Sequence, residues 1–201
     1  MNNIQPIDPT RATGKTKQLF DTMKAKMGMI PNALRIIGNS PAALEGYLSL
    51  GDAVGESVLS PKTREQIFLA ISEENGCSYC LSVHSQTSRR AGLSKDDILH
   101  ARQGTGTDKK ADSAVKFARK VSEERGKVDA FDLADVRKVG FTDAEIVEIV
   151  ASVILISFTN YANNAFDPVI DFPIVKPGVF APEGKTSAAA LPNSSQGHLN
   201  V

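Results

Sequence analysis

The sequence predicts an all-α protein: a helical bundle with an extended arm before it and a proline-rich tail after it. Apolar residues recur three and four positions apart along most of the chain, which is the spacing of one helix face. Serine–proline pairs and Thr142 followed by Glu145 supply helix starts. No segment shows a convincing strand pattern. We therefore expect an arm at 1–13, a helical domain at 14–166 and an extended tail at 167–201.

Four helices are expected in the first part of the chain. A helical pattern begins at Gly14 and is broken by Gly28 and Pro31, after which a second, short pattern begins. Ser40-Pro41 and Ser60-Pro61 each place an N-cap before a proline at the first helical position. The expected helices lie at about 14–27, 33–37, 41–55 and 62–75.

The second part predicts five more helices, each bounded by a glycine or a cap. They are expected at 77–91, after Ser94, at 108–125, at 131–139 and at 143–164, with a loop at 103–107. The apolar stretch Ile149–Phe158 in the last of them is shorter than the roughly 20 residues that span a bilayer, so it predicts a buried helix. Five of the ten prolines follow Asp167. This tail is expected to be extended, with its last twenty residues disordered.

Charge and composition exclude several classes of partner. Lys plus Arg equals Asp plus Glu at 23 each, so the formal net charge is zero. A broad basic field for nucleic acid or an anionic membrane is therefore not expected. The first residues show neither the basic nor the apolar region of a secretory signal, which favours a cytoplasmic protein.

Chemistry is expected at the only two cysteines, Cys77 and Cys80, which form one Cys-x-x-Cys. A disulfide-stabilised scaffold would use several pairs that close longer loops. On a helix, Cys77, Cys80 and His84 share one face, with Cys77 in the first turn, where the helix dipole favours a thiolate. His84 can deprotonate Cys80. One sulfur can then attack a peroxide oxygen or a disulfide, and the other can resolve the product by closing a Cys77–Cys80 bond.

The same residues carry a resemblance to a known family. Glu65, then Cys77-Ser78-Tyr79-Cys80 twelve residues later, His84 and Gly92 match the pattern of the alkylhydroperoxidase AhpD-like proteins, within the carboxymuconolactone decarboxylase superfamily. The resemblance covers about residues 60–100, with the motif at 65–92. It implies an AhpD-like helical bundle that forms a homo-oligomer, a trimer or a hexamer.

The resemblance also implies an activity and residue roles. The activity is reduction of hydroperoxides, organic ones above all, by a dithiol that cycles through a disulfide. Cys80 would attack, Cys77 would resolve, His84 would accept the proton, and Glu65 would orient His84. No metal, haem or flavin is needed, because sulfur is the redox centre, but an external thiol or a thioredoxin-like or lipoyl-type reductant must restore the dithiol. Well-studied members have histidine where this chain has Tyr79, so the resemblance does not supply the natural substrate.

Other interpretations of these residues stay open at this point. The same dithiol could exchange disulfides with a protein partner. It could also hold zinc with His84 and Glu65, although no second Cys-x-x-Cys completes a structural site. Tyr79 and Glu73 are candidates for supporting residues around the site, or for packing and a helix-end charge. The amides at 160–164 are typical of a helix end or a subunit contact, with a pocket wall as the alternative.

Overall fold

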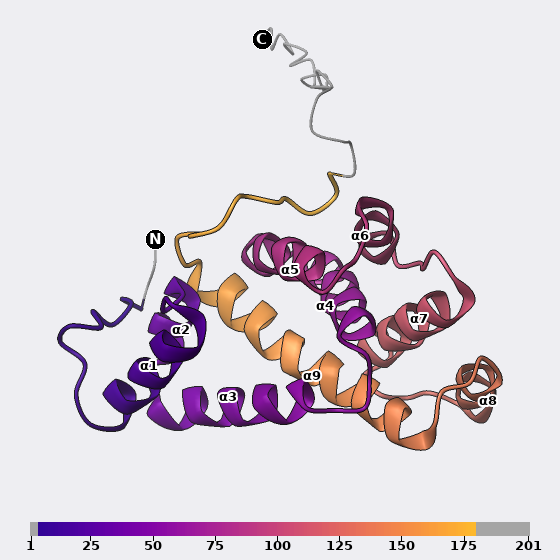
Figure 1. The fold of residues 1–201 in the computed structure, drawn as a ribbon, viewed down its shortest axis with the longest axis horizontal. Helices are drawn as coiled ribbons and strands as arrows, with labels where there is room; N and C mark the ends of the chain where they lie inside the picture. Colours follow the sequence, from indigo (N-terminus) through magenta and orange to yellow (C-terminus); the bar gives the residue numbers. More distant parts are fainter. Residues whose placement is uncertain (1–3, 180–201) are drawn as a thin grey trace, which may run out of the picture.

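The computed structural model describes residues 4–179. Within this range the chain forms nine helices and no strand, which confirms the all-α prediction (Figure 1). Residues 1–3 and 180–201, and with them the predicted disorder of the last twenty residues, lie outside the described range. The helices are α1 (Gly14–Met27), α2 (Asn32–Ile37), α3 (Pro41–Gly55), α4 (Pro61–Glu74), α5 (Ser78–Arg90), α6 (Lys95–Arg102), α7 (Lys109–Glu123), α8 (Ala130–Lys138) and α9 (Asp143–Phe166).

Caps encoded in the sequence start these helices. The side chains of Ser40 and Ser60 accept hydrogen bonds from the backbone N–H groups three residues later, as the serine–proline pairs predict. Thr142 and Glu145 form the expected capping box of α9. This helix runs two residues beyond the predicted end, because its last turn closes only where Asp167 adopts a left-handed conformation (φ 46°).

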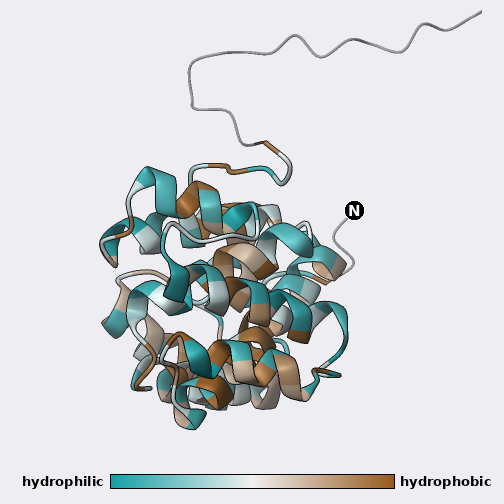
Figure 2. Cartoon of the chain, turned by 90° about the vertical axis from the view of Figure 1, so that its right-hand side faces the viewer, coloured by the Kyte–Doolittle hydropathy of each residue, from teal (hydrophilic) through white to brown (hydrophobic). Residues whose placement is uncertain are grey.

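Helix α4 lies at the centre of the fold. Seven consecutive residues, Gln66 to Ser72, are buried, so this helix has neighbours on every side. It packs against α5, α6, α7 and α9. Figure 2 shows hydrophobic residues concentrated where helices face one another and hydrophilic residues on the outer faces. A helix surrounded in this way holds whatever side chains it presents in fixed positions.

Helix α9 crosses the molecule beneath α4 and extends past α3 (Figure 1). Its length and composition would suffice to cross a membrane, yet half of the relevant stretch is buried inside the fold. That degree of burial is typical of the core helix of a folded domain, which is how the sequence pattern was interpreted. One face of α9 nevertheless stays exposed and apolar, at Val147, Val150, Ile154, Phe158 and Tyr161.

The segments outside the helices are fastened to them. In the arm, the backbone N–H of Ile7 donates to the carbonyl of Arg35, and the Arg35 Nε donates back to the carbonyl of Ile7. After α9, residues 167–179 run without helix or strand across the face formed by α2 and α5. We call residues 167–179 the strap. The backbone N–H of Val175 donates to Ser82 Oγ at 2.9 Å, which ties the strap to α5.

The central position of α4 makes its stability contribution testable. Replacing Ile71, which is fully buried, with alanine should lower the free energy of unfolding by about 3 kcal/mol. The change leaves a cavity that the surrounding helices cannot move in to fill. The matched change Ile174→Ala, at a strap residue that is 65% exposed, should cost about 0.5 kcal/mol or less. Urea unfolding followed by circular dichroism measures both. Equal costs for the two variants would contradict the central position of α4.

Candidate active site

A tight backbone reversal between α4 and α5 creates the site. Gly76 adopts a left-handed conformation (φ 65°), and its N–H donates to the carbonyl of Glu73, while the N–H of Cys77 donates to the carbonyl of Ser72. This pair of bonds is the Schellman motif, which ends a helix within two residues. Glycine accepts this conformation without the steric cost that a Cβ would add. Cys77 therefore lies shortly after the end of α4 and directly before the first residue of α5.

Cys77 is the N-cap of α5. Its Sγ accepts a hydrogen bond from the backbone N–H of Cys80 at 3.2 Å. The sequence predicts Cys77 inside the first turn of the helix, and this prediction is wrong by one residue. The Gly76 reversal leaves the backbone of Cys77 extended (φ −84°, ψ 93°), so the helix begins at the next residue. The two sulfurs are paired as a disulfide, with the Cα atoms 5.4 Å apart. Both cysteines are buried.

His84 and Glu65 form a direct contact between α5 and α4. His84 Nδ1 lies 3.0 Å from Glu65 Oε2, and both side chains are mostly buried. The same carboxylate oxygen accepts hydrogen bonds from Thr87 Oγ1 at 2.7 Å and Ser88 Oγ at 3.2 Å. Three groups of α5 thus converge on one carboxylate of α4, which fixes the orientation of the imidazole.

This arrangement affects the ionisation of Glu65. Burial raises the pKa of the carboxyl, but the neighbouring His84 and the hydrogen bonds from His84, Thr87 and Ser88 outweigh it and hold the pKa below its ordinary value. Glu65 is therefore a carboxylate at neutral pH. In that form it can stabilise a protonated imidazole.

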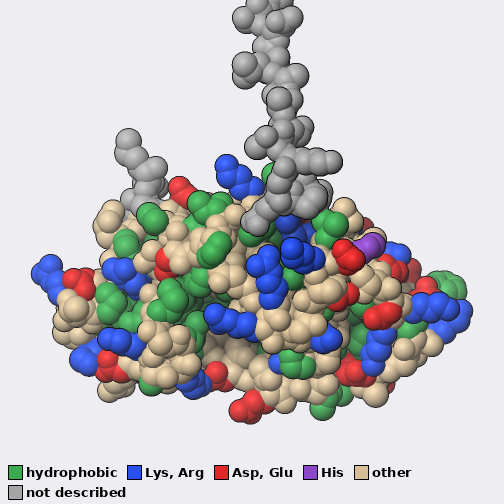
Figure 3. Space-filling model, turned by 45° about the horizontal axis from the view of Figure 1, so that its top comes forward, with side chains coloured by type: hydrophobic (Ala, Val, Ile, Leu, Met, Phe, Trp, Pro, Cys, Tyr) green, Lys and Arg blue, Asp and Glu red, His purple; other side chains and the backbone are tan. Residues whose placement is uncertain are grey.

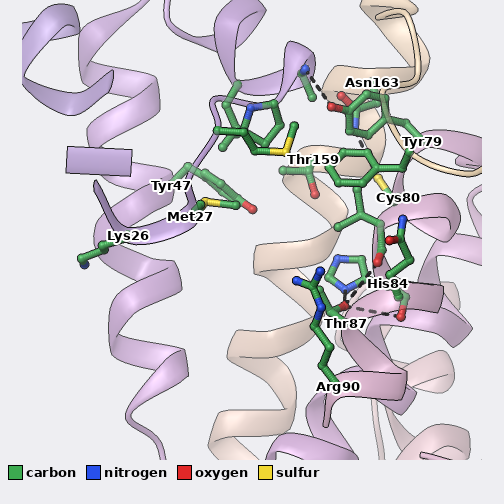
Figure 4. A pocket seen from close by; sticks show the side chains of 17 residues that line it. Lys26, Met27, Tyr47, Tyr79, Cys80, His84, Thr87, Arg90, Thr159 and Asn163 are labelled. Atoms are coloured by element: carbon green, nitrogen blue, oxygen red, sulfur yellow. Dashed lines mark hydrogen bonds between the residues drawn. The ribbon is translucent and has the colours of Figure 1, made fainter. Parts of the chain in front are cut away.

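Cys80 and His84 open into a common cavity of about 420 Å³ (Figure 4). Residues of α1, α2, α3, α5, α9 and the strap line it, and most of its wall is apolar, whereas Cys77 is not part of that wall. The apolar side chains include Met27, Met29, Leu34, Val83 and Phe172. A mainly apolar cavity with several polar side chains in its wall is typical of a small-molecule site.

Asn163 of α9 is the nearest polar group to the sulfurs. Its Nδ2 donates to Cys80 Sγ at 3.2 Å and lies 3.9 Å from Cys77 Sγ, and the residue is buried. Three residues earlier, the fully buried Asn160 donates to Ser72 Oγ at 3.1 Å. Of the roles considered for the amides at 160–164, Asn163 has that of a residue in the cavity wall. An N–H aimed at a sulfur favours the thiolate once the disulfide is reduced.

Tyr79, between the cysteines, is directed away from the His84–Glu65 pair. Its hydroxyl donates to Asp171 of the strap at 2.5 Å and accepts from the backbone N–H of Ala33 at 3.2 Å. Burial and the Asp171 hydrogen bond raise the pKa of Tyr79, so it stays a neutral phenol. Its ring also meets Phe172 edge to face, with the centroids 5.8 Å apart. Tyr79 thus fastens the strap that supplies one wall of the cavity.

Glu73, the other candidate supporting residue, lies outside the cavity. Its carboxylate accepts hydrogen bonds from Arg102 Nε at 2.8 Å and from the backbone N–H of Gly178. It joins α4 to α6 and to the strap. Its hydrogen-bond partners include neither cysteine nor His84, so its geometry indicates a structural contact.

Besides Asn163, three groups that the sequence did not single out contribute to the site. Thr87 and Ser88 follow His84 by three and four residues, a helical spacing that could have indicated their contact with the same carboxylate. The run of amides gave a signal for Asn163. Asp171 gave none, since a lone aspartate in a proline-rich tail has no local pattern. Among residues 4–179, no group of three or more His, Cys, Asp or Glu side chains lies close enough to hold a metal ion.

Comparison with known proteins supports the resemblance of the sequence. Residues 41–124, which include α3 to α7, match the model of the carboxymuconolactone decarboxylase family. No curated protein sequence matches the chain significantly.

Several solved structures share the fold. The AhpD core of an uncharacterised peroxidase-related protein from Ralstonia eutropha JMP134 has a TM-score of 0.73 at 20% identity, over 82% of this chain and 90% of that one. A peroxidase-related protein from Silicibacter sp. TM1040 has a TM-score of 0.70 at 23% identity, over 89% and 97% of the two chains. The debrominase Bmp8, in complex with 2,3,4-tribromopyrrole, has a TM-score of 0.69 at 19% identity, over 85% and 92%.

The ionisation of Glu65 gives a pH-dependent prediction for stability. Because the pKa of Glu65 in the folded protein lies below the ordinary value of 4.5, Glu65 stabilises the protein fully above that pH, and the contribution is lost as the pH falls through the lower, folded value. Glu65→Gln should therefore cost about 2 kcal/mol at pH 7, and the gap to the wild type should close on acidification. Urea unfolding from pH 7 downward measures this.

Glu123→Gln is the control for Glu65→Gln. Glu123 pairs with Arg119 at 2.7 Å, but its side chain is 49% exposed. Its loss should change stability by about 0.5 kcal/mol or less at pH 7. A Glu65→Gln cost that stays constant through the acid range would show that the carboxylate charge contributes nothing.

Proposed function

We propose that this chain is an AhpD-like member of the carboxymuconolactone decarboxylase superfamily and a thiol-dependent hydroperoxide reductase that uses Cys80 and Cys77, which the family match of residues 41–124 and the shared fold support. The observation that carries the proposal is the cavity. It brings one sulfur of a buried pair, an imidazole held by a carboxylate, and an apolar space for an organic substrate into one enclosed volume. At the family level the fold supports an antioxidant role.

The positions of the two sulfurs support Cys80 as the attacking residue and Cys77 as the resolving residue. Cys80 lines the cavity and is 3% exposed, whereas Cys77 is fully buried behind it. Cys80 is thus the sulfur that a substrate in the cavity can reach. Cys77 lies one helical turn away, already close enough to close a disulfide.

The proposed reaction proceeds in two balanced steps. The Cys80 thiolate attacks the terminal peroxide oxygen, the O–O bond breaks, and the alkoxide takes a proton to leave as the alcohol. Cys80 becomes a sulfenic acid. The thiol of Cys77 then attacks that sulfur, water leaves, and the disulfide forms. In total, one hydroperoxide and two thiols give one alcohol, one water and one disulfide.

His84 is proposed to move the protons of this cycle. Its Nδ1 is held by Glu65, so Nε2 is the nitrogen left for the cavity side. Nε2 can take the proton of the Cys80 thiol and return it to the leaving alkoxide. Glu65 stabilises the imidazolium between these two events, as the carboxylate of a base–orienter pair does.

Regeneration requires an external dithiol, which supplies two electrons and two protons to the Cys77–Cys80 disulfide. The burial of both sulfurs favours a slender donor that enters the cavity, such as a lipoyl-type group, over a thioredoxin-like protein surface. We propose that sulfur alone is the redox centre, without metal, haem or flavin. A reducing compartment, the cytoplasm, would keep the dithiol available.

Exchange with a protein disulfide is the main alternative function. It uses the same sulfurs, but a partner's disulfide must approach in line with Cys80, and only 3% of that residue is exposed. This burial favours a small substrate. The debrominase with a similar fold indicates that proteins of this architecture also act on compounds other than peroxides.

We also propose that the protein forms a homo-oligomer, a trimer or a hexamer. The exposed apolar face of α9 supports this. Its residues recur three and four positions apart, and beside its C-terminal part lies an open, almost wholly apolar hollow that includes Phe158 and Tyr161. Apolar surface of this extent is typical of an interface.

The two cysteines should differ in their reaction with peroxide. After a stoichiometric pulse of cumene hydroperoxide, the reduced wild type should lose the mass of two hydrogens. Cys77→Ser should stop at a Cys80 sulfenic acid that dimedone traps, and Cys80→Ser should not react. Intact-mass analysis measures all three. Thiols that stay unchanged on the timescale of free cysteine would exclude the peroxidase activity.

The Asn163 hydrogen bond should favour the Cys80 thiolate. Asn163→Leu should slow alkylation of Cys80 in the reduced protein by about tenfold at pH 7 and move the pH profile of alkylation to higher pH, because the thiolate loses a donor. Asn163→Asp should slow it further, since a carboxylate opposes the thiolate. Asn164→Leu is the control, because Asn164 donates to the carbonyl of Asn75 and not to sulfur. Unchanged pH profiles in both Asn163 variants would exclude this role.

A further inference from the structure

The charged side chains around the active-site cavity all have the same sign. Lys26 and Arg90 line it together with His84, and no aspartate or glutamate does. On the face shown in Figure 3, Lys and Arg side chains surround a hollow with hydrophobic walls. An anionic group would therefore meet attraction and no opposing carboxylate in the lining.

Of these three groups, Arg90 is the one available to a ligand. Lys26 Nζ is bound by both carboxylate oxygens of Asp52, at 3.0 and 3.2 Å. His84 is bound by Glu65. Arg90 makes no hydrogen bond or ion pair with any residue between 4 and 179. Its planar guanidinium presents paired N–H donors that match a carboxylate in a bidentate arrangement.

The positions of Arg90 and Cys80 on α5 leave room for a chain-like ligand. Arg90 follows Cys80 by ten residues, which places their backbone positions about 15 Å apart along the axis of α5 and the guanidinium nearer to the sulfur than that. Side chains on a helix lean toward its N-terminus, and in Figure 4 Arg90 points back along α5 toward His84. On α5 the lining between them includes Val83 but also His84, Gln86 and Thr87, and most of the apolar wall comes from other elements, such as Met27, Leu34 and Phe172. The cavity thus combines a reactive sulfur, a mainly apolar wall and an available guanidinium.

We propose that the substrates of this site are amphiphilic hydroperoxides, in which an apolar chain separates the hydroperoxide from a terminal carboxylate. The hydroperoxide lies at Cys80, the chain lies against the apolar wall, and the carboxylate pairs with Arg90. This inference deepens the proposed peroxidase function, on which it rests for the reactive group. Recognition of the carboxylate by Arg90 is independent of turnover.

The experiment compares reduced wild type, Arg90→Met and the control Arg89→Met. Arg89 is the exposed neighbour of Arg90 and does not line the cavity. Single-turnover oxidation is followed with linoleic acid hydroperoxide, its methyl ester and cumene hydroperoxide. Arg90→Met should lower the second-order rate constant for the acid about tenfold and leave those for the ester and cumene hydroperoxide within about twofold. Arg89→Met should change none of them.

A binding measurement separates this inference from the proposed function. The alcohol product of linoleic acid hydroperoxide and its methyl ester are titrated into the oxidised protein, where no chemistry occurs. We expect the acid to bind about tenfold more tightly than the ester, and Arg90→Met to remove that preference. Arg90-dependent binding without any peroxide turnover would overturn the proposed function and the hydroperoxide as substrate, and would keep only the recognition of a carboxylate by Arg90. Turnover of cumene hydroperoxide with equal binding of acid and ester would overturn the inference alone.

Discussion

The backbone reversal at Gly76 determines where every reactive atom of this protein lies. Because Gly76 ends α4 within two residues, Cys77 becomes the N-cap of α5, and both sulfurs lie where unpaired backbone N–H groups concentrate. Helix α5 then packs against α4, so His84 of α5 contacts Glu65 of α4 directly. A site assembled on one hairpin of central helices is held by the core itself.

The two buried amides of α9 each have a polar partner inside this core. Asn160 donates to Ser72, and Asn163 donates to the cysteine sulfurs, so α9 contributes its amides to the same helices that carry the reactive groups. An unpaired amide would be costly at such depth. This requirement fixes the position of α9 relative to the dithiol, and it supplies a donor to sulfur without adding a charge to the cavity.

The helices were predictable because their signals are local. Serine–proline starts, capping boxes and glycine ends depend on neighbouring residues, and Cys77, Cys80 and His84 follow helical spacing. Glu65, on another helix, was indicated by the resemblance to the AhpD-like pattern. Contacts between distant segments were not predictable. Asp171 lies ninety-two residues from its partner Tyr79, and Arg90 had no pattern to distinguish it from Arg89. The position of Cys77 was missed by one residue, since the Gly76 reversal depends on backbone geometry.

The cavity wall is formed partly by helices and partly by the strap. Phe172 covers the reactive chemistry from a segment that has no helix or strand and that is secured at single points, such as Asp171 and Val175. Its sequence can therefore change with less disturbance than that of α4 or α5. Substrate preference can diversify through this segment while the redox machinery stays constant, so the shape of the entrance and the chemistry behind it can evolve separately.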